Sequence, residues 1–302
     1  MRISTNTDFS PALEATGDAI RLTHDAGFDC FDLSLFGMKS DDHRFNAPGY
    51  EKYARELRHI ADECGIVCNQ SHAPFPSSYP DTTPEWIAAN RTLPDKLRRA
   101  MEIAAIVGAK TIVVHPQQHL HWNGNAAELQ EINRAFYTSL LPYCREYGIR
   151  VGVENMWQMN RYGKNIVDST CANPAEFLSY MEMLDPAWFV ACLDIGHCTL
   201  TDHSPAEAIR ALGHKHLHAL HVHDNDGIGD LHSMPFQCPS ARVNWEKTTD
   251  ALAEIDYDGD ITLELNYLSG KLPADLLPAY LKYAAATARY LASEVERKKK
   301  QG

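Results

Sequence analysis

The chain has 302 residues, of which 44% are hydrophobic, so it is long enough to bury a large core. Its formal net charge of −12 argues against a surface built mainly to bind nucleic acid or anionic lipid.

The compartment is indicated by three further features of the sequence. The first residues lack the apolar core of a signal peptide, and no apolar run approaches the length of a membrane span. The cysteines form no CxxC pair, and several lie in apolar periodic segments, which indicates reduced and buried thiols. We therefore expect a soluble cytoplasmic protein.

Short β-type runs alternate with amphipathic helical stretches along the chain. Strands are predicted at 2–7, 30–36, 66–72, 111–116, 150–155, 189–197, 217–224 and 260–266. Helices are predicted at 11–26, 49–64, 84–107, 126–147, 174–184, 205–213, 244–255 and 273–297. Glycines close several of these helices, and "NPAEF" and "SPAEA" open two of them with a capping residue followed by proline.

This alternation predicts a parallel sheet, and eight strands are the number that closes a (β/α)8 TIM barrel. Because no linker-like tract or shift in composition interrupts the chain, we expect residues 1–302 to form a single domain, with 297–302 as a frayed tail. The long predicted loops follow the C-terminal ends of strands, the face where barrels carry their active sites. They are 37–48, 73–83, 116–125, 156–172 and 225–243.

Metal-binding types of side chain stand at the predicted ends of the third to eighth strands. They are His72, His115, Glu154, Asp194 with His197, His221 and Glu264, and the loop after His221 adds Asp230 and His232. A lone histidine at a strand end is usually an ordinary hydrogen-bonded group, but carboxylates inside apolar β runs are rarely buried without a partner. Since these strand ends meet at one rim, the joint pattern predicts a metal site.

The neighbouring residues refine this prediction. Gly152, Ala219 and Thr262 share strand faces with Glu154, His221 and Glu264, so small side chains are expected beneath the ligands. His223 and Asp224 are expected to orient ligands or to cap the loop. Other histidines resemble a metal tract but are expected to lie at the surface or face outward, and have no assigned role: His214, His216, His218 and the pair within 119–121.

The motifs "VEN" (153–155), "LDIGH" (193–197), "HVHDN" with "DLH" (221–232) and "LELN" (263–266) occur in this order. Their order and spacing resemble those of the xylose isomerase-like TIM barrels, a superfamily of sugar isomerases, ketose 3-epimerases and endonuclease IV. The resemblance implies one divalent metal ion held by Glu154, Asp194, His221 and Glu264, with His197 contacting substrate or metal. His72, His115, Asp230 and His232 match the remaining positions of the three-zinc cluster of endonuclease IV, which implies a second metal or groups that support the first.

The resemblance implies an isomerase or epimerase of a ketose, a related polyol ketone or a sugar phosphate, with Glu154 and Glu264 moving the proton through a metal-stabilised enediolate. Mn²⁺ or Zn²⁺ suits imidazole with carboxylate best, with Co²⁺ or Mg²⁺ as further choices. His197, Trp157 and Arg242 are expected to contact substrate, and Trp122 could also line the pocket.

Three alternatives remain open on sequence alone. A zinc phosphodiesterase of the endonuclease IV type would need a basic groove, which a charge of −12 and the loops do not supply. A dehydratase, or a lyase that cleaves an oxidised glycoside, could use the same proton abstraction. A catalytically inactive barrel that only binds a partner would lack some of the metal-ligating residues, and none of them is missing. We expect a carbohydrate substrate, no nucleic acid or membrane partner, and a homo-oligomer.

Overall fold

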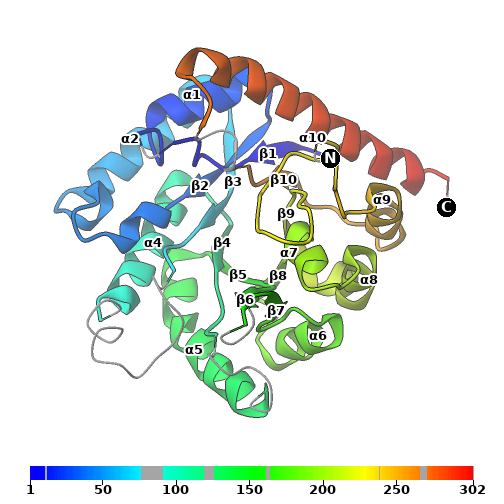
Figure 1. The fold of residues 1–302 in the computed structure, drawn as a ribbon. Helices are drawn as coiled ribbons and strands as arrows, with labels where there is room; N and C mark the ends of the chain where they lie inside the picture. Colours follow the sequence, from blue (N-terminus) through cyan, green and yellow to red (C-terminus); the bar gives the residue numbers. More distant parts are fainter. Residues whose placement is uncertain are drawn as a thin grey trace.

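A closed ring of parallel strands forms the centre of the molecule (Figure 1). The structure, a computed structural model, describes residues 1–10, 12–75, 91–118, 126–160, 164–237, 239–265 and 271–301. The ring consists of β1 (Ile3–Thr5), β2 (Cys30–Ser34), β3 (Val67–His72), β4 (Thr111–Val114), β5 (Arg150–Glu154), β8 (Phe189–Asp194), β9 (Leu217–His221) and β10 (Ile261–Leu263). These are the strands that the sequence predicts.

The ring closes where two separately paired sheets meet. Strands β2, β3, β4, β5, β8 and β9 form one parallel sheet in this order, and β1 pairs with β10. Single parallel bridges, Asn6 with Asp32 and Val222 with Leu263, join the two sheets on both sides of the β1–β10 pair. The predicted TIM barrel is therefore confirmed.

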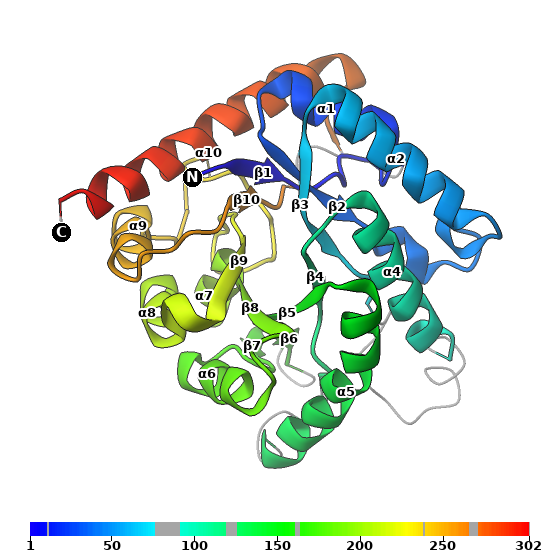
Figure 2. The same cartoon turned by 180° about the vertical axis from the view of Figure 1, so that it is seen from behind.

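Helices surround the ring, as both views show (Figure 2). They are α1 (Gly17–Ala26), α2 (Tyr50–Cys64), α4 (Leu93–Val107), α5 (Ala126–Tyr147), α6 (Pro174–Met183), α8 (Pro205–His216), α9 (Trp245–Glu254) and α10 (Leu277–Lys299). The predicted caps form: the Asn173 side chain accepts from two backbone amides, and the Ser204 hydroxyl accepts from the amide of Glu207. Part of the predicted helix 84–107 lies outside the described residues.

Two helix boundaries differ from the prediction. The helix predicted at 11–26 begins only at Gly17, because the Thr16 side chain caps it by accepting from the Ala19 amide. Helix α10 extends beyond the predicted end at 297 and continues to Lys299, within the predicted tail. Lys298 Nζ holds this end by donating to the carbonyl of Glu246 and the hydroxyl of Thr249, both at 2.8 Å.

The sequence also misses short elements inside the predicted loops. The loop 156–172 contains an antiparallel hairpin, β6 (Trp157–Met159) with β7 (Ile166–Asp168). The end predicted for the sixth strand is the short helix α7 (Ile195–Leu200), which Asp194 caps by accepting from the His197 amide at 2.7 Å. This cap turns the chain sharply after β8 and brings His197 back over the barrel mouth.

Small residues fill the barrel interior beneath the strand ends, as predicted. Val113, Cys192 and Ala219 pack together there, and a Cβ placed on Gly152 would lie 3.4 Å from Cys192 Cβ. A larger residue than glycine at position 152 would therefore crowd the floor of the site.

Register irregularities occur in two strand pairs. Cys68 pairs with Phe31 and Gln70 with Asp32, so Asn69 is an inserted residue in β3. Likewise Leu217 and Ala219 pair with consecutive residues of β8, so His218 is inserted in β9. Such insertions change which side chains face the interior beyond them.

The remaining general expectations concern thiols and membrane spans. The cysteines of the described ranges are free, and all of them except Cys64 are buried; Cys238 lies outside the described residues. Within those same ranges, no helix has both the length and the apolar character that crossing a bilayer requires.

Candidate metal centre

Four predicted ligands meet at the C-terminal ends of β5, β8, β9 and β10, and together we call them the central site: Glu154, Asp194, His221 and Glu264. Each offers one ligand atom, and these atoms all lie within 4.8 Å of one another. His221 Nδ1 lies 2.7 Å from Glu154 Oε1, 3.2 Å from Glu264 Oε2 and 3.9 Å from Asp194 Oδ2. One imidazole nitrogen thus faces three carboxylates.

The chemistry of this donor set fits a divalent cation. All four side chains are buried, and the most exposed of them, Glu264, has only 5% of its surface accessible. Three carboxylates taken out of water so close together repel one another unless a positive charge lies among them. Mixed imidazole and carboxylate donors are a set that Mn²⁺ and Zn²⁺ accept readily.

A second group, the β3–β4 cluster, consists of His72, His115 and Glu154. Glu154 Oε2 lies 2.9 Å from His115 Nε2 and 3.4 Å from His72 Nε2, and the two imidazole nitrogens are 3.1 Å apart. Because Glu154 Oε1 faces His221, the two oxygens of one carboxylate serve two adjacent groups.

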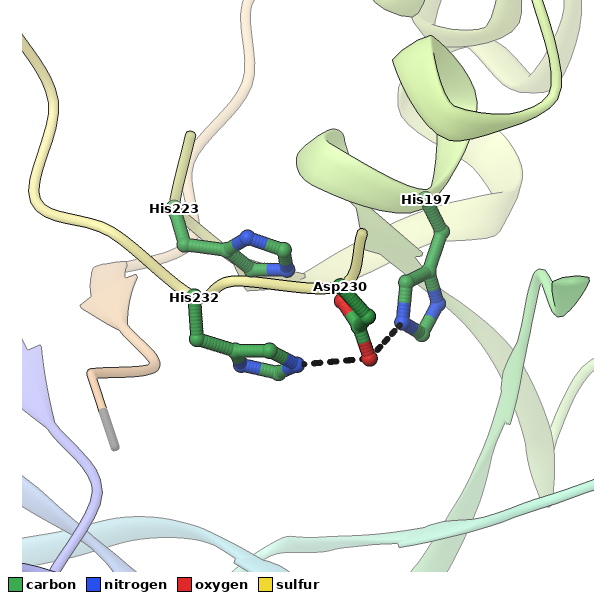
Figure 3. A group of neighbouring side chains, drawn as sticks. All are labelled: His197, His223, Asp230 and His232. Atoms are coloured by element: carbon green, nitrogen blue, oxygen red, sulfur yellow. Dashed lines mark ion pairs between the residues drawn. The ribbon is translucent and has the colours of Figure 1, made fainter. Parts of the chain in front are cut away.

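A third group, the loop cluster, consists of His197, His223, Asp230 and His232 (Figure 3). Asp230 Oδ2 lies between two imidazoles, 3.1 Å from His232 Nε2 and 3.7 Å from His197 Nε2. The rings of His223 and His232 stack with their centroids 4.0 Å apart. The structure thus brings together every residue predicted for a second metal or for its support in two groups, one of which shares Glu154 with the central site while the other contacts Asp194 through His223.

His223 and Asp224 make the contacts expected of groups that orient ligands and anchor the loop. His223 Nε2 lies 2.9 Å from Asp194 Oδ1, and Gly196 leaves room for this ring, since a Cβ there would come within 2.0 Å of it. Asp224 accepts from the indole of Trp245 at 3.0 Å and from the amide of Val243 at 3.3 Å. His223 is in addition a member of the loop cluster, which the sequence analysis did not foresee.

Within the loop cluster, the imidazoles and the carboxylate shift one another's pKa values toward the charged forms. Burial lowers the pKa of His232, but Asp230 and Glu264 outweigh it and raise the pKa to about 9. Burial likewise opposes charge on His197, yet Asp194 and Asp230 raise its pKa well above the usual value. For Asp230, the nearby imidazoles overcome burial and hold its pKa well below the usual range. A cation that binds here must therefore displace protons from imidazoles.

Of the predicted substrate contacts outside the loop cluster, Trp157 has a contact with a cluster member, His197. The Trp157 ring, on β6, stands edge-on to the His197 ring with centroids 6.5 Å apart. Arg242 packs over Gly227, and its guanidinium lies 3.8 Å from Asp202. Their roles as substrate contacts remain predictions. Trp122 lies outside the described residues.

The histidines without an assigned role do not join these groups. His214 Nδ1 and His218 Nε2 lie near the backbone carbonyls of Asp256 and Lys215. His216, the last residue of α8, is buried with 4% of its surface accessible, so of the two predicted placements the surface one is wrong for it. Residues 119–121 lie outside the described residues.

Sequence reasoning missed two carboxylates, one in β2 and one in the segment that follows β1. Asp32, in β2, is 1% exposed, and its Oδ2 lies 3.5 Å from His221 Nε2. Asp8 follows Thr7, whose amide donates to the Asp32 carbonyl; burial and then Glu264 raise the pKa of Asp8. A buried carboxylate in the apolar run "CFDLS" was the signal for Asp32, by the same argument that identified Glu154.

Comparison with known proteins gives three findings. A family described as "Xylose isomerase-like TIM barrel" matches residues 20–289. The chain is 28% identical over 259 residues to an uncharacterized protein of Methanocaldococcus jannaschii, covering 84% of this chain and 81% of that protein. The solved structure of a D-tagatose 3-epimerase-like protein is similar with a TM-score of 0.73 and 21% identity, covering 100% of this chain and 99% of that one.

Two further solved structures share the fold. D-psicose 3-epimerase from Clostridium cellulolyticum H10 has a TM-score of 0.69 at 16% identity, covering 96% of this chain and 99% of its own. The 3-keto-D-glucoside 4-epimerase of E. coli has a TM-score of 0.68 at 17% identity, covering 97% and 99%. At these identities the structural likeness establishes the barrel architecture.

Proposed function

The chain belongs to the xylose isomerase-like TIM barrel family, and from that premise we propose that it is a divalent-metal-dependent isomerase or epimerase. Its substrate would be a ketose, a related polyol ketone or a sugar phosphate. The central site carries this proposal, because three buried carboxylates and one imidazole nitrogen converge at the ends of four strands. The structural neighbours named as sugar epimerases support the choice of substrate class.

The two glutamates of the central site are suited to move a proton. A divalent cation, Mn²⁺ or Zn²⁺ before Co²⁺ or Mg²⁺, would polarise a substrate carbonyl and hydroxyl and stabilise the negative charge of the enediolate. Glu154 and Glu264 reach the site from β5 and from the end of β10, at 2.7 and 3.2 Å from the same His221 nitrogen. One carboxylate would take the carbon-bound proton and the other would return one.

The groups beside the central site offer contacts for the rest of a sugar. The Nδ1 atom of His197 lies 2.8 Å from the carbonyl of Asn155, which orients Nε2 toward Asp230 and the barrel mouth. This nitrogen would bind a sugar hydroxyl, and Trp157 beside it would form an apolar wall. Arg242 would have to leave Asp202 in order to bind a phosphate group.

A second candidate function follows from the β3–β4 and loop clusters. Together with the central site they could hold more than one zinc ion, the arrangement that a phosphodiesterase needs to generate hydroxide and clamp a phosphate. The net charge of −12 weighs against a DNA substrate. A dehydratase or a lyase acting on an oxidised glycoside would use the central site as the proposed isomerase does.

The first test is the metal content per chain, measured by elemental mass spectrometry on protein purified without chelator or affinity-tag metal. About one manganese, cobalt or zinc ion would support the isomerase, and two or three zinc ions would require the phosphodiesterase reading to be tested first. The loaded protein is then incubated with a panel of ketoses in deuterated water. Deuterium on a product carbon is expected; cleavage of an abasic-site oligonucleotide with no exchange into any sugar would overturn the proposal.

A further inference from the structure

A chain of hydrogen bonds crosses the barrel interior beneath the central site. Ser4 Oγ, on β1, donates to Asn69 Oδ1 at 2.8 Å, and Asn69 Nδ2 donates to Thr262 Oγ1 at 3.1 Å. The Thr262 hydroxyl donates to Gln70 Oε1 at 3.4 Å, and Gln70 Nε2 donates to Asp32 Oδ2 at 2.8 Å. In each of these hydrogen bonds the donor lies on the side of Ser4 and the acceptor on the side of Asp32.

This direction is imposed by the groups themselves. If the Gln70 amide were turned over, its oxygen would face the Asp32 carboxylate, and two acceptors would repel each other. The Thr262 hydroxyl accepts from Asn69, which leaves its single proton for Gln70 Oε1. Asp32 therefore stands at the end of the chain as an acceptor, and among the described residues its Oδ1 atom has no hydrogen-bond partner.

A further neighbour of this acceptor is His221. Its Nε2 atom lies 3.5 Å from Asp32 Oδ2 and, within the described part of the chain, has no hydrogen-bond partner. Its Nδ1 atom faces the three carboxylates of the central site. Both His221 and Asp32 are almost completely inaccessible to solvent, so water does not compete for this contact.

We propose that Asp32 is a positioning residue, which accepts the Nε2 proton of His221 and so presents the Nδ1 lone pair to a cation in the central site. A neutral imidazole carries its proton on one nitrogen only, so a group that requires the proton on Nε2 also fixes Nδ1 as the ligand. Carboxylate partners of ligating histidines act in this way, and they increase the basicity of the ligand. The hydrogen-bond chain from Ser4 fixes Asp32 in turn.

The inserted residue in β3 makes this arrangement possible. Asn69 and Gln70 are adjacent in sequence, and adjacent residues of a regular strand face opposite sides. Because Asn69 is the unpaired residue of the register shift, both side chains take part in the interior chain. The bulge thus supplies two consecutive links of the chain: Asn69 joins β1 to β10, and Gln70 joins β10 to β2.

The inference rests on the metal-binding part of the proposed function, and the test separates the two. Zinc affinity is measured for the full-length protein by competition with a chelating dye. The Nε2 proton of His221 is observed by ¹H–¹⁵N NMR in zinc-loaded and metal-free protein, and assigned by its loss in His221→Gln. Asp32→Asn keeps the shape of the side chain and removes its charge, so we expect the zinc Kd to rise about 10-fold. Asp32→Ala removes the acceptor as well, so we expect the zinc Kd to rise about 100-fold. In both variants the proton resonance moves upfield.

Two further variants keep the proposal open to refutation. Gln70→Met retains Asp32 and removes the amide that donates to it and accepts from Thr262, so we expect a zinc Kd about 3-fold higher, the effect of a lost hydrogen bond. Asp29→Asn is the matched control, because Asp29 precedes the same strand but pairs with Arg289 at 2.8 Å, and both readouts should stay at wild-type values. Unchanged zinc Kd and an unmoved resonance in the Asp32 variants would overturn the assignment. Should wild type bind none of zinc, manganese, cobalt and magnesium, the proposed function fails, and an unmoved resonance in metal-free Asp32→Asn would separately refute the contact.

Discussion

The central site and the loop cluster contain similar side chains but are held in different ways. The four ligands of the central site stand at strand ends or directly after one, and the paired backbone of the barrel fixes their spacing. In the loop cluster, Asp230 and His232 belong to the segment between β9 and α9, and the Asp230 side chain is 22% exposed against 0% for Asp194. His232 also adopts a positive φ of 43°, which a non-glycine residue keeps only where its surroundings require it.

This difference indicates that the central site carries out the proton transfer and that the loop cluster modulates it. Strand ends hold groups to the accuracy that proton transfer needs, whereas loops vary and carry specificity. A change in the central site should therefore abolish the reaction, and a change in the loop cluster should alter its rate or the number of ions held.

The largest effect is expected for Glu154→Gln. The amide cannot take a proton and is a poorer ligand, so turnover should fall about 1000-fold or more, measured as deuterium incorporation into the product. The control is Glu254→Gln, which changes an exposed glutamate paired with Arg210 and should leave turnover unchanged. Substantial activity in Glu154→Gln would remove the acid–base assignment and with it the contrast between the two regions.

The second effect concerns the pH dependence of stability in metal-free protein. The pKa of His232 is raised to about 9 in the folded protein. Protonated His232 therefore contributes fully to the free energy of unfolding below the unfolded pKa of 6.5, and this contribution is lost as pH rises toward 9. At roughly 1.4 kcal/mol per pKa unit the loss is at most about 3 kcal/mol. Thermal unfolding of chelator-treated protein at pH 6.5 and 9.5 measures it. In Asp230→Asn the stability should depend less on pH. An unchanged pH dependence in that variant would contradict the pairing of Asp230 with His232.

A smaller effect on activity is expected for Asp230→Asn. The loop cluster loses its carboxylate while all four ligands of the central site remain, so we expect a roughly 10-fold loss of turnover, the size of effect seen for outer contacts, and at most one metal ion fewer per chain. The matched control is Asp226→Asn in the same loop, whose side chain accepts from the amides of Ile228 and Gly229, which asparagine can also do. Complete inactivation by Asp230→Asn would make the two regions equally essential.

The smallest effect is expected for Trp157→Phe, which keeps an aromatic wall beside His197 but shortens it. We expect KM for the ketose to rise about 3-fold with kcat nearly unchanged, because the contact would be similar in the ground and transition states. Steady-state kinetics measures kcat and KM separately. A change confined to kcat would place this ring nearer the reacting atoms.

The barrel and the central site could be predicted because their signals are periodic. Parallel strands end at one rim, so Glu154 and Glu264 are adjacent in space although far apart in the chain. The role of Asp32 depends instead on the register shift at Asn69, and an inserted residue changes neither hydrophobic period nor strand boundaries in a recognisable way. Similarly, His223 joins the loop cluster through the path of the 225–243 loop, which has no local sequence signal.

The shared carboxylate of Glu154 has a thermodynamic consequence. One oxygen faces His221 and the other faces His115, at 2.7 and 2.9 Å, so this side chain belongs to both the central site and the β3–β4 cluster. An ion at one position would draw the carboxylate toward it and neutralise part of its charge. The affinities of the two positions would then be linked, and by reciprocity each ion would change the binding of the other by the same factor. Binding isotherms for such a pair would show cooperativity of either sign and would not decompose into two independent steps.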